Sequence, residues 1–452
     1  MASRRRYLQL FSTAAVGAIA GCADDARDGG TATAEQETPP TQPESTIEPD
    51  VLTTHQTKLT AADGDEWDYF GSAVAVSGDG TTALIGARLD EEPNGTDGGA
   101  AYVFTAEGGS WTQQAKLTPA DGESTEEFGN AVAVSSDGTT ALVGTADDTD
   151  PDGERVGAGY IFAADSGSWT QQAKLDMDDA DTSDNFVEAV ALSSDGTTAL
   201  VGTPIDGDPN GLYAGSAYVF GGVDGSWTQQ AKLVPDDGDT NDGFGYSVAV
   251  SGDGTTALIG ARLDEDPNGR NAGSAYIFED NGGSWRQQTK LSPDDGEVAA
   301  WFGESVGLSD AGTTALIGAV NQDGPDDVET GATFVFDSAN GAWDHEATLT
   351  PDRGSKSDLF GGSVAVSRDG TTALVGAKNS DQPNGRGAGS AYVFDVTGDG
   401  WTLRRELTSE SRNLNDSFGA SLDVSNDGAT ALVGAFGEPN AEFVGSAYVF
   451  EL

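Results

Sequence analysis

The chain has 452 residues and carries 75 acidic against 22 basic side chains, which gives a net charge of −53. Such a surface repels nucleic acid phosphates and anionic lipid headgroups, so we expect neither as a direct partner. The single cysteine, Cys22, excludes an internal disulfide. The only histidines, His55 and His345, leave little material for zinc binding or histidine-based catalysis.

The acids are dispersed through a regular pattern and do not form blocks, which favours a solvated acidic skin on a folded protein. Proteins of salt-loving organisms have this character, and calcium buffering is the functional alternative.

Residues 1–21 are predicted to be an export signal. They begin with an arginine cluster around Arg4 and Arg5 that resembles the twin-arginine motif, followed by a mild apolar run from Leu10 to Ala20. That run is too short to span a bilayer, which takes roughly 20 apolar residues. It ends in Ile19-Ala20-Gly21-Cys22, which resembles a lipobox, so we predict a lipid on Cys22 and a location on the outer side of the cell membrane. The alternative is a plain extension with a stray cysteine.

Residues 22–52 have a different composition, rich in Thr, Glu, Asp, Pro and Gln and nearly free of aliphatic side chains. This composition predicts a disordered, acidic tether.

The rest of the chain, residues 53–452, is built on a repeat of 58 residues. The repeat is marked by seven phenylalanines, six of which are followed by glycine: Phe70, Phe128, Phe186, Phe244, Phe302, Phe360 and Phe418. A period of this size marks one supersecondary unit that must stack on its neighbours to bury its apolar surface.

Within the first repeat, four strands are expected, at residues 70–76, 81–87, 100–104 and 111–117. Ser77-Gly78-Asp79-Gly80 makes a tight turn between the first two. Four antiparallel strands repeated seven times predict an all-β, seven-bladed propeller. The chain ends on a third strand, and residues 53–59 match the missing fourth, so an N-terminal outer strand is expected to close blade seven.

Phe-Gly, then Leu84-Ile85-Gly86-Ala87, then Gly-Ser-Ala-Tyr-Val-Phe resemble the FG-GAP repeat of integrin α-subunit heads, and most closely its secreted prokaryotic branch. The resemblance covers residues 53–452. It implies a propeller displayed outside the cell and used for adhesion or recognition.

The resemblance also implies a calcium loop in the first hairpin, but here that hairpin is short and the later ligand position is Ala83. One carboxylate per turn cannot supply the six to eight oxygens that calcium takes, so no calcium site is carried over. Acids in longer loops could still hold calcium weakly: Asp206, Asp208, Asn210, Asp264, Asp266 and Asn268. A plain turn explains them equally well, and no other cofactor is expected.

In such a blade, the turns between strands one and two and between three and four lie on one side of the disc, here called the first face. The longer loops lie on the second face, and binding residues concentrate on variable loops. The aromatics that interrupt the repeat there are the candidate ligand-binding residues Trp67, Tyr69 and Trp301, with Tyr213 and Phe443 in similar loops. Packing onto neighbouring loops is the alternative.

A second candidate is a basic sector in blade six, formed by Arg353, Lys356, Lys378 and Arg386. It could receive an acidic glycan or protein, or it could balance local charge without a partner.

No Ser/His/Asp arrangement, metal-spaced histidines or phosphate loop joined to a helix is found, so an enzyme such as a propeller hydrolase is disfavoured. The expected function is recognition or adhesion, through a cell-surface glycan or protein. A passive envelope component is the alternative.

Overall fold

The computed structural model describes residues 56–122, 124–149, 155–177, 187–207, 209–294, 296–324, 328–339, 341–381, 383–398, 400–410, 414–437 and 444–452. Cys22, Arg4, Arg5, residues 1–55 as a whole, Phe186, Asp208 and Phe443 lie outside this part. Within it, no helix is long and apolar enough to cross a membrane.

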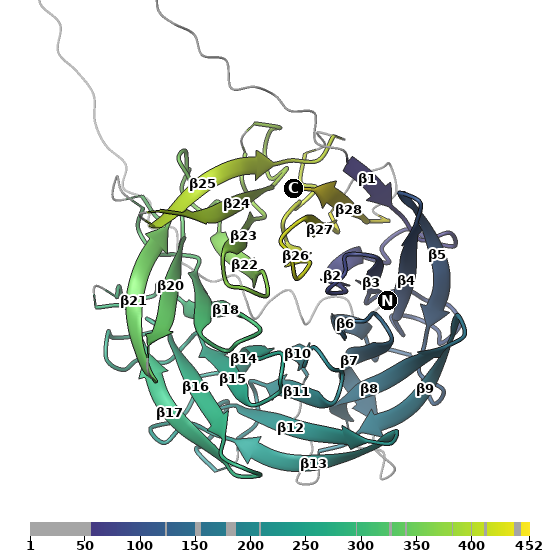
Figure 1. Ribbon diagram of the computed structural model, residues 1–452, viewed down its shortest axis with the longest axis horizontal. Helices are drawn as coiled ribbons and strands as arrows, with labels where there is room; N and C mark the ends of the chain where they lie inside the picture. The colour runs from purple at the N-terminus through teal and green to yellow at the C-terminus, as the bar shows by residue number, and fades with distance from the viewer. Residues whose placement is uncertain are drawn as a thin grey trace, which may run out of the picture. The chain divides into compact units, whose positions relative to one another are not determined.

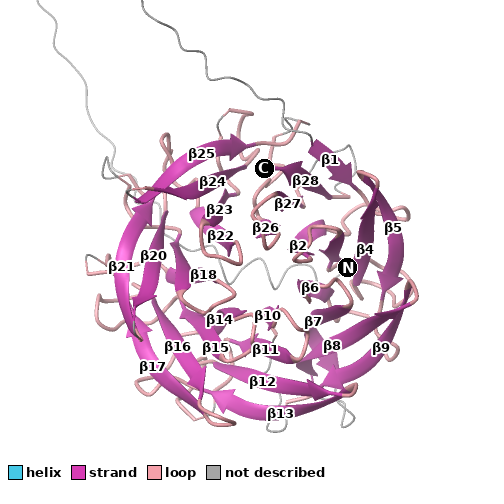
Figure 2. Cartoon of the chain, viewed as in Figure 1, coloured by secondary structure: helices cyan, strands magenta, loops and turns pink. Residues whose placement is uncertain are grey.

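The described residues form seven four-stranded antiparallel sheets arranged as the blades of a ring, which confirms the predicted propeller (Figure 1). Figure 2 shows that strands and loops make up the whole ring. The strands of blades one to three are β2 (Phe70–Val76), β3 (Thr82–Ala87), β4 (Ala100–Glu107), β5 (Ser110–Leu117); β6 (Phe128–Val134), β7 (Thr140–Thr149), β8 (Arg155–Asp165), β9 (Ser168–Leu175); β10 (Ala189–Leu192), β11 (Thr198–Thr203), β12 (Ser216–Val223) and β13 (Ser226–Leu233).

Those of blades four to seven are β14 (Phe244–Val250), β15 (Thr256–Ala261), β16 (Ser274–Asp280), β17 (Trp285–Leu291); β18 (Phe302–Leu308), β19 (Thr314–Ala319), β20 (Ala332–Ala339), β21 (Ala342–Leu349); β22 (Phe360–Val366), β23 (Thr372–Ala377), β24 (Ser390–Thr397), β25 (Gly400–Leu407); β26 (Ser421–Val424), β27 (Thr430–Ala435), β28 (Ser446–Glu451) and β1 (Gln56–Leu59).

Strand β1 closes the ring as predicted. It is the outer strand of blade seven and pairs antiparallel with β28, with Gln56 opposite Phe450 and Leu59 opposite Ala447. The two ends of the propeller therefore share one sheet, in which β1 covers β28 and becomes the outer edge strand, as β5 is in blade one.

The apolar core lies between neighbouring blades. Phe70 is fully buried, and its ring meets the ring of Tyr102 at 5.5 Å and that of Phe104 at 6.0 Å, edge-on. The same cluster contains Leu432 and Val449 of blade seven. Each blade thus buries one face against the next, which explains why a single repeat does not suffice.

Glycines at the repeat positions permit close contact between blades. A side chain at Gly86 would clash with the carbonyl oxygen of Gly129 in blade two. Gly129 itself has a φ of 90° beside a β-bulge between Phe128 and Ala131, where other residues are strained.

Two rings of backbone hydrogen bonds join the blades. On the second face, the backbone amide of the phenylalanine that marks each repeat donates to a backbone carbonyl of the preceding blade. For example, Phe302 donates to the carbonyl of Ala272 at 2.9 Å. On the first face, the second residue of each β-turn donates to the same residue of the next blade. These residues are Gly78, Ser136, Ser194, Gly252, Asp310, Arg368 and Asn426, with distances of 2.9–3.1 Å, and the seventh bond returns to Gly78.

Candidate functional site

The predicted ligand-binding aromatics fall into two groups. Trp67 and Tyr213 lie on second-face loops with 42% and 46% of their surface exposed. Tyr69 and Trp301 are only half-buried and interact with other side chains. The sequence placed all four on the second face, and the structure shows that they differ in exposure.

Trp301 belongs to a cluster close to the ring axis. The guanidinium of Arg262 lies 3.5 Å from the ring centre of Tyr246 and 5.2 Å from that of Trp301. A nitrogen of Arg262 also lies 2.8 Å from a carboxylate oxygen of Glu304. Because Arg262 is nearly fully buried and held on three sides, it orders this cluster.

Tyr69 occupies the equivalent repeat position in blade one. Its ring lies 5.7 Å from the ring of Phe436 and 5.6 Å from the guanidinium of Arg88. Arg88 in turn lies 3.8 Å from Glu127. Two arginine–aromatic pairs, from blades one and four, therefore flank the axis on the second face.

The backbone at Trp67, Tyr69 and Trp301 has positive φ values of 79°, 58° and 59°. The equivalent residues of other blades adopt the same conformation, for example Asn241 at 74° and Leu359 at 59°. This strain recurs in each linker between blades that the structure describes, so it does not mark these aromatics as a functional site.

The four residues of the predicted basic sector differ in their burial and in their partners. Lys356 pairs with Glu329 at 3.0 Å, and both side chains are at least half exposed. Lys378 is half-buried at the repeat position of Arg88 and Arg262, whereas Arg353 and Arg386 are exposed. Exposed pairs of this kind contribute roughly 0–1 kcal/mol, so local charge balance explains Lys356.

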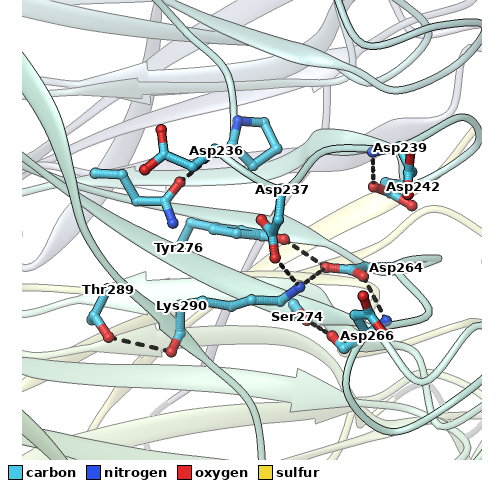
Figure 3. A network of polar contacts seen from close by, with 12 residues as sticks. Asp236, Asp237, Asp239, Asp242, Asp264, Asp266, Ser274, Tyr276, Thr289 and Lys290 are labelled. Atoms are coloured by element: carbon cyan, nitrogen blue, oxygen red, sulfur yellow. Dashed lines mark hydrogen bonds and ion pairs between the residues drawn. The ribbon is translucent and has the colours of Figure 1, made fainter.

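A buried polar network ties each of the first four blades together, and Figure 3 shows the one in blade four. Lys290 on β17 lies 2.7 Å from Asp264 in the β15–β16 loop and 2.7 Å from Asp237 in the linker before blade four. The hydroxyl of Tyr276 on β16 donates to Asp264 at 2.6 Å. Burial opposes the charge on Lys290, but its hydrogen bonds with Asp237 and Asp264 outweigh that effect and raise its pKa.

The network recurs around Lys116, Lys174 and Lys232. In blade six, the four positions hold Ser380, Tyr392, Glu406 and Arg353. Where blade four has Lys290 and Asp237, blade six thus has Glu406 and Arg353, so the two charges are exchanged. Arg353 therefore occupies a regular position of the repeat, and no ligand is needed to explain it.

The FG-GAP repeat model matches the chain seven times, at residues 53–104, 111–162, 169–220, 227–278, 285–336, 343–394 and 401–450. The chain belongs to the FG-GAP repeat family. Each matched unit begins on the outer strand of one blade and ends on the third strand of the next, so the FG-GAP unit is out of phase with the blade. No curated protein matches the sequence.

The loop acids proposed as weak calcium ligands have other contacts in this FG-GAP propeller. Asp264 accepts from Tyr276 and Lys290, and Asp206 accepts from Tyr218. The side-chain amide of Asn268 donates to the backbone carbonyl of Pro293 at 2.9 Å. Among the described residues, no group of three His, Cys, Asp or Glu side chains is arranged to hold a metal ion.

The most enzyme-like feature of the described FG-GAP blades is a carboxyl pair on the outer rim of blade five. The hydrogen bond to Asp337 raises the pKa of Glu346 to about 7, and burial adds to the effect. His345 lies nearby, but its Nε2 is 3.0 Å from the carbonyl of Ala347 and 3.1 Å from Thr348 Oγ1. His345 is exposed on β21, and these two hydrogen-bond contacts are with residues of the same strand.

The first-face turns between the first two strands of each blade resemble one another, but their second residues differ. Asn426 donates to the hydroxyl of Ser136 at 2.7 Å, and Arg368 lies 2.6 Å from Asp310, which also accepts from Ser194. These side chains meet across blades on the first face of the ring. The signal was visible in the sequence, because this turn position holds Gly, Ser, Asp, Arg or Asn in different blades, whereas the third position is Asp in all blades except blade five, which has Ala311.

Proposed function

We propose that the protein is a non-enzymatic recognition or adhesion module that binds a glycan or protein through its second face. The observation that carries this proposal is the distribution of exposed apolar side chains. Among the described residues, five of the seven large exposed apolar side chains are on second-face loops: Trp67, Leu212, Tyr213, Val298 and Leu414. Exposed aromatic and aliphatic residues at loop tips are typical of contact surfaces.

Backbone contacts connect several of these residues between blades. Asn241, in the linker to blade four, donates its amide to the carbonyl of Leu212 in blade three at 2.9 Å. Asn415 donates in the same way to Arg386, next to Leu414. The exposed apolar side chains are therefore presented on loops that are fixed to the ring, which lowers the entropy lost on binding.

We also propose export by the twin-arginine route and lipid attachment at Cys22, which would place the propeller on the outer side of the cell membrane. This part of the proposal rests on the order of motifs in residues 1–22.

The binding proposal is tested with the Trp67→Ala, Tyr213→Ala double variant. We expect weaker binding of the purified protein to intact cell surfaces, with an unchanged melting temperature. The matched control is Val223→Ala with Val396→Ala, which removes the two exposed apolar side chains of the first face. Equal binding by wild type and both double variants contradicts a second-face surface and favours a passive envelope role.

A further inference from the structure

Two segments of the chain have the sequence Asn-x-Ser/Thr, in which the side-chain amide of the asparagine can receive a glycan when a protein is exported. They are Asn94-Gly95-Thr96 and Asn415-Asp416-Ser417, and no other asparagine of the chain has Ser or Thr at this spacing. The first lies in the β3–β4 loop of blade one, and the second lies in the linker between β25 and β26. Because the motif does not distinguish them, the surroundings of the two side-chain amides decide which one is accessible.

The side-chain amide of Asn94 is enclosed by its neighbours. Its Nδ2 atom is buried and has no hydrogen-bond partner among the described residues. A methyl group added at Gly122, in the linker to blade two, would clash with this nitrogen. The asparagines at the same repeat position, Asn210, Asn268 and Asn384, donate their side-chain amides to backbone carbonyls of the next linker at 3.3, 2.9 and 3.2 Å. Asn94 therefore packs its loop against the linker, and its nitrogen is not accessible in the folded blade.

The side chain of Asn415 has the opposite surroundings. It is exposed, and it makes no hydrogen bond or ion pair with another residue in the described part of the chain. Asp416 is fully buried, whereas Ser417 is half-buried and its hydroxyl group forms no hydrogen bond within the described ranges. The nitrogen and the hydroxyl group of the motif are thus both left unoccupied, and the side chain between them is the one that anchors the linker.

The position of Asn415 faces solvent throughout the ring. The residues at the same place in the other described linkers are all exposed, and each is followed by a buried residue: Trp67, Thr125, Asn241, Ala299 and Ser357. Backbone hydrogen bonds fix the segment, since Asn415 donates to the carbonyl of Arg386 at 2.9 Å and Ser417 donates to that of Gly387 at 3.2 Å. The acceptor amide is therefore presented by the folded propeller and does not depend on unfolding.

We propose that Asn415 is N-glycosylated on the outer side of the membrane and that Asn94 is not. The inference rests on the export part of the proposed function, because the twin-arginine route carries proteins across the membrane after they have folded. The donor is a sugar that is linked through a phosphate group to a lipid. Nδ2 of Asn415 attacks the anomeric carbon of this sugar, so that a carbon–nitrogen bond forms while the bond from that carbon to the phosphate oxygen breaks. The lipid phosphate leaves with the electron pair, and one amide proton passes to a base of the transferase.

The test uses the full-length protein, produced in its native host and extracted from the membrane fraction. Mass spectrometry of its peptides should show the added mass of one or more sugar residues on the peptide that contains Asn415, and no added mass on the peptide that contains Asn94.

Three variants and their melting temperatures complete the test. Asn415→Asp keeps a side chain that tolerates the φ of 62° at this position but removes Nδ2, and Ser417→Ala removes the hydroxyl group, so both should lose the added mass. Ser417→Thr keeps a hydroxyl group at the same position and is the matched control, which should retain the added mass.

The outcomes separate this inference from the proposed function. Protein in the membrane fraction whose Asn415 peptide has its unmodified mass overturns the inference and leaves export standing, whereas unmodified protein that stays inside the cell refutes both. A glycan on Asn94 also overturns the inference, because the fold would then not select the acceptor. Added mass that persists in Asn415→Asp does the same, since another residue would then carry it.

Discussion

The amide of Asn426 donates to the carbonyl oxygen of Gly78 at 3.0 Å and so joins blade seven to blade one. It completes the cycle of seven backbone hydrogen bonds on the first face. Together with the pairing of β1 and β28, it means that the ring is closed at the inner turns as well as at the outer edge. The two closures lie at opposite ends of the same blades and constrain the ring independently.

Removal of the closing strand should destabilise the whole propeller. Deletion of residues 53–60 removes β1 and leaves β28 without its outer neighbour, so we expect a strong fall in the melting temperature. Calorimetry measures the melting temperature of the deletion variant. A second variant that lacks eight residues from 23–52 is the control for chain length. An unchanged melting temperature after the first deletion would show that the inner closure suffices.

Gly86→Ala should be among the most damaging single changes. The new methyl group would meet the backbone carbonyl of Gly129, which cannot move aside as a side chain can, so we expect a loss of roughly 3 kcal/mol. Gly108→Ala is the matched control, since that glycine has a φ of 59° but open space around it, and should cost only about 1 kcal/mol. Denaturant unfolding of both variants gives the comparison, and equal losses would exclude close blade contact as the reason for the glycine.

Lys290→Met tests whether the buried network stabilises its blade. The change leaves Asp264 and Asp237 facing each other without their shared cation, and we expect a loss of about 2 kcal/mol. Lys356→Met removes the exposed partner of Glu329 and should change stability by less than about 0.5 kcal/mol. If both variants unfold at the same denaturant concentration, the Lys–Tyr–Asp contacts do not contribute to stability.

Asp242→Asn should stabilise the protein in a pH-dependent way. Burial raises the pKa of Asp242 from 3.8 to about 6, against the hydrogen bond that it accepts from the amide of Asp239 at 2.6 Å. Its protonation favours the folded state, so this contribution is fully present below pH 3.8 and is lost as the pH rises through 6. Asparagine keeps the acceptor without the charge.

The variant should therefore melt at a higher temperature than wild type at pH 8, and the gap should close towards pH 4. Asp236→Asn, an exposed acid in the same linker that does not contribute to the pKa shift of Asp242, serves as the control. If the difference in melting temperature between the variant and wild type does not change with pH, titration of the Asp242 carboxyl group does not affect stability.

Cys22→Ser should release the protein from the membrane fraction, because the apolar run before it is too short to span a bilayer. Arg4→Lys with Arg5→Lys should instead stop export, so that the protein stays inside the cell. Immunoblots of cell fractions distinguish the two results. Membrane retention of the Cys22→Ser protein would rule out the lipid anchor.

The sequence by itself determined the architecture. The 58-residue period and the tight turn between the first two strands predicted seven four-stranded blades, and the strand bounds in the first repeat agree within a few residues. The match of residues 53–59 to the outer strands predicted the closure. These are local properties, since each strand and turn is specified by neighbouring residues, and repetition makes the pattern unambiguous.

Only the tertiary structure decided which side chains meet. Arg88 and Arg262 occupy the same repeat position, yet only the structure shows that they meet different aromatic side chains: Tyr69 lies beside Arg88, whereas Tyr246 and Trp301 lie beside Arg262. In the same way, only the structure shows that Lys356 of the predicted basic sector pairs with Glu329. The physical reason is that contacts between blades depend on how far each loop residue lies from the axis of the ring. The repeat pattern of the sequence does not specify that distance.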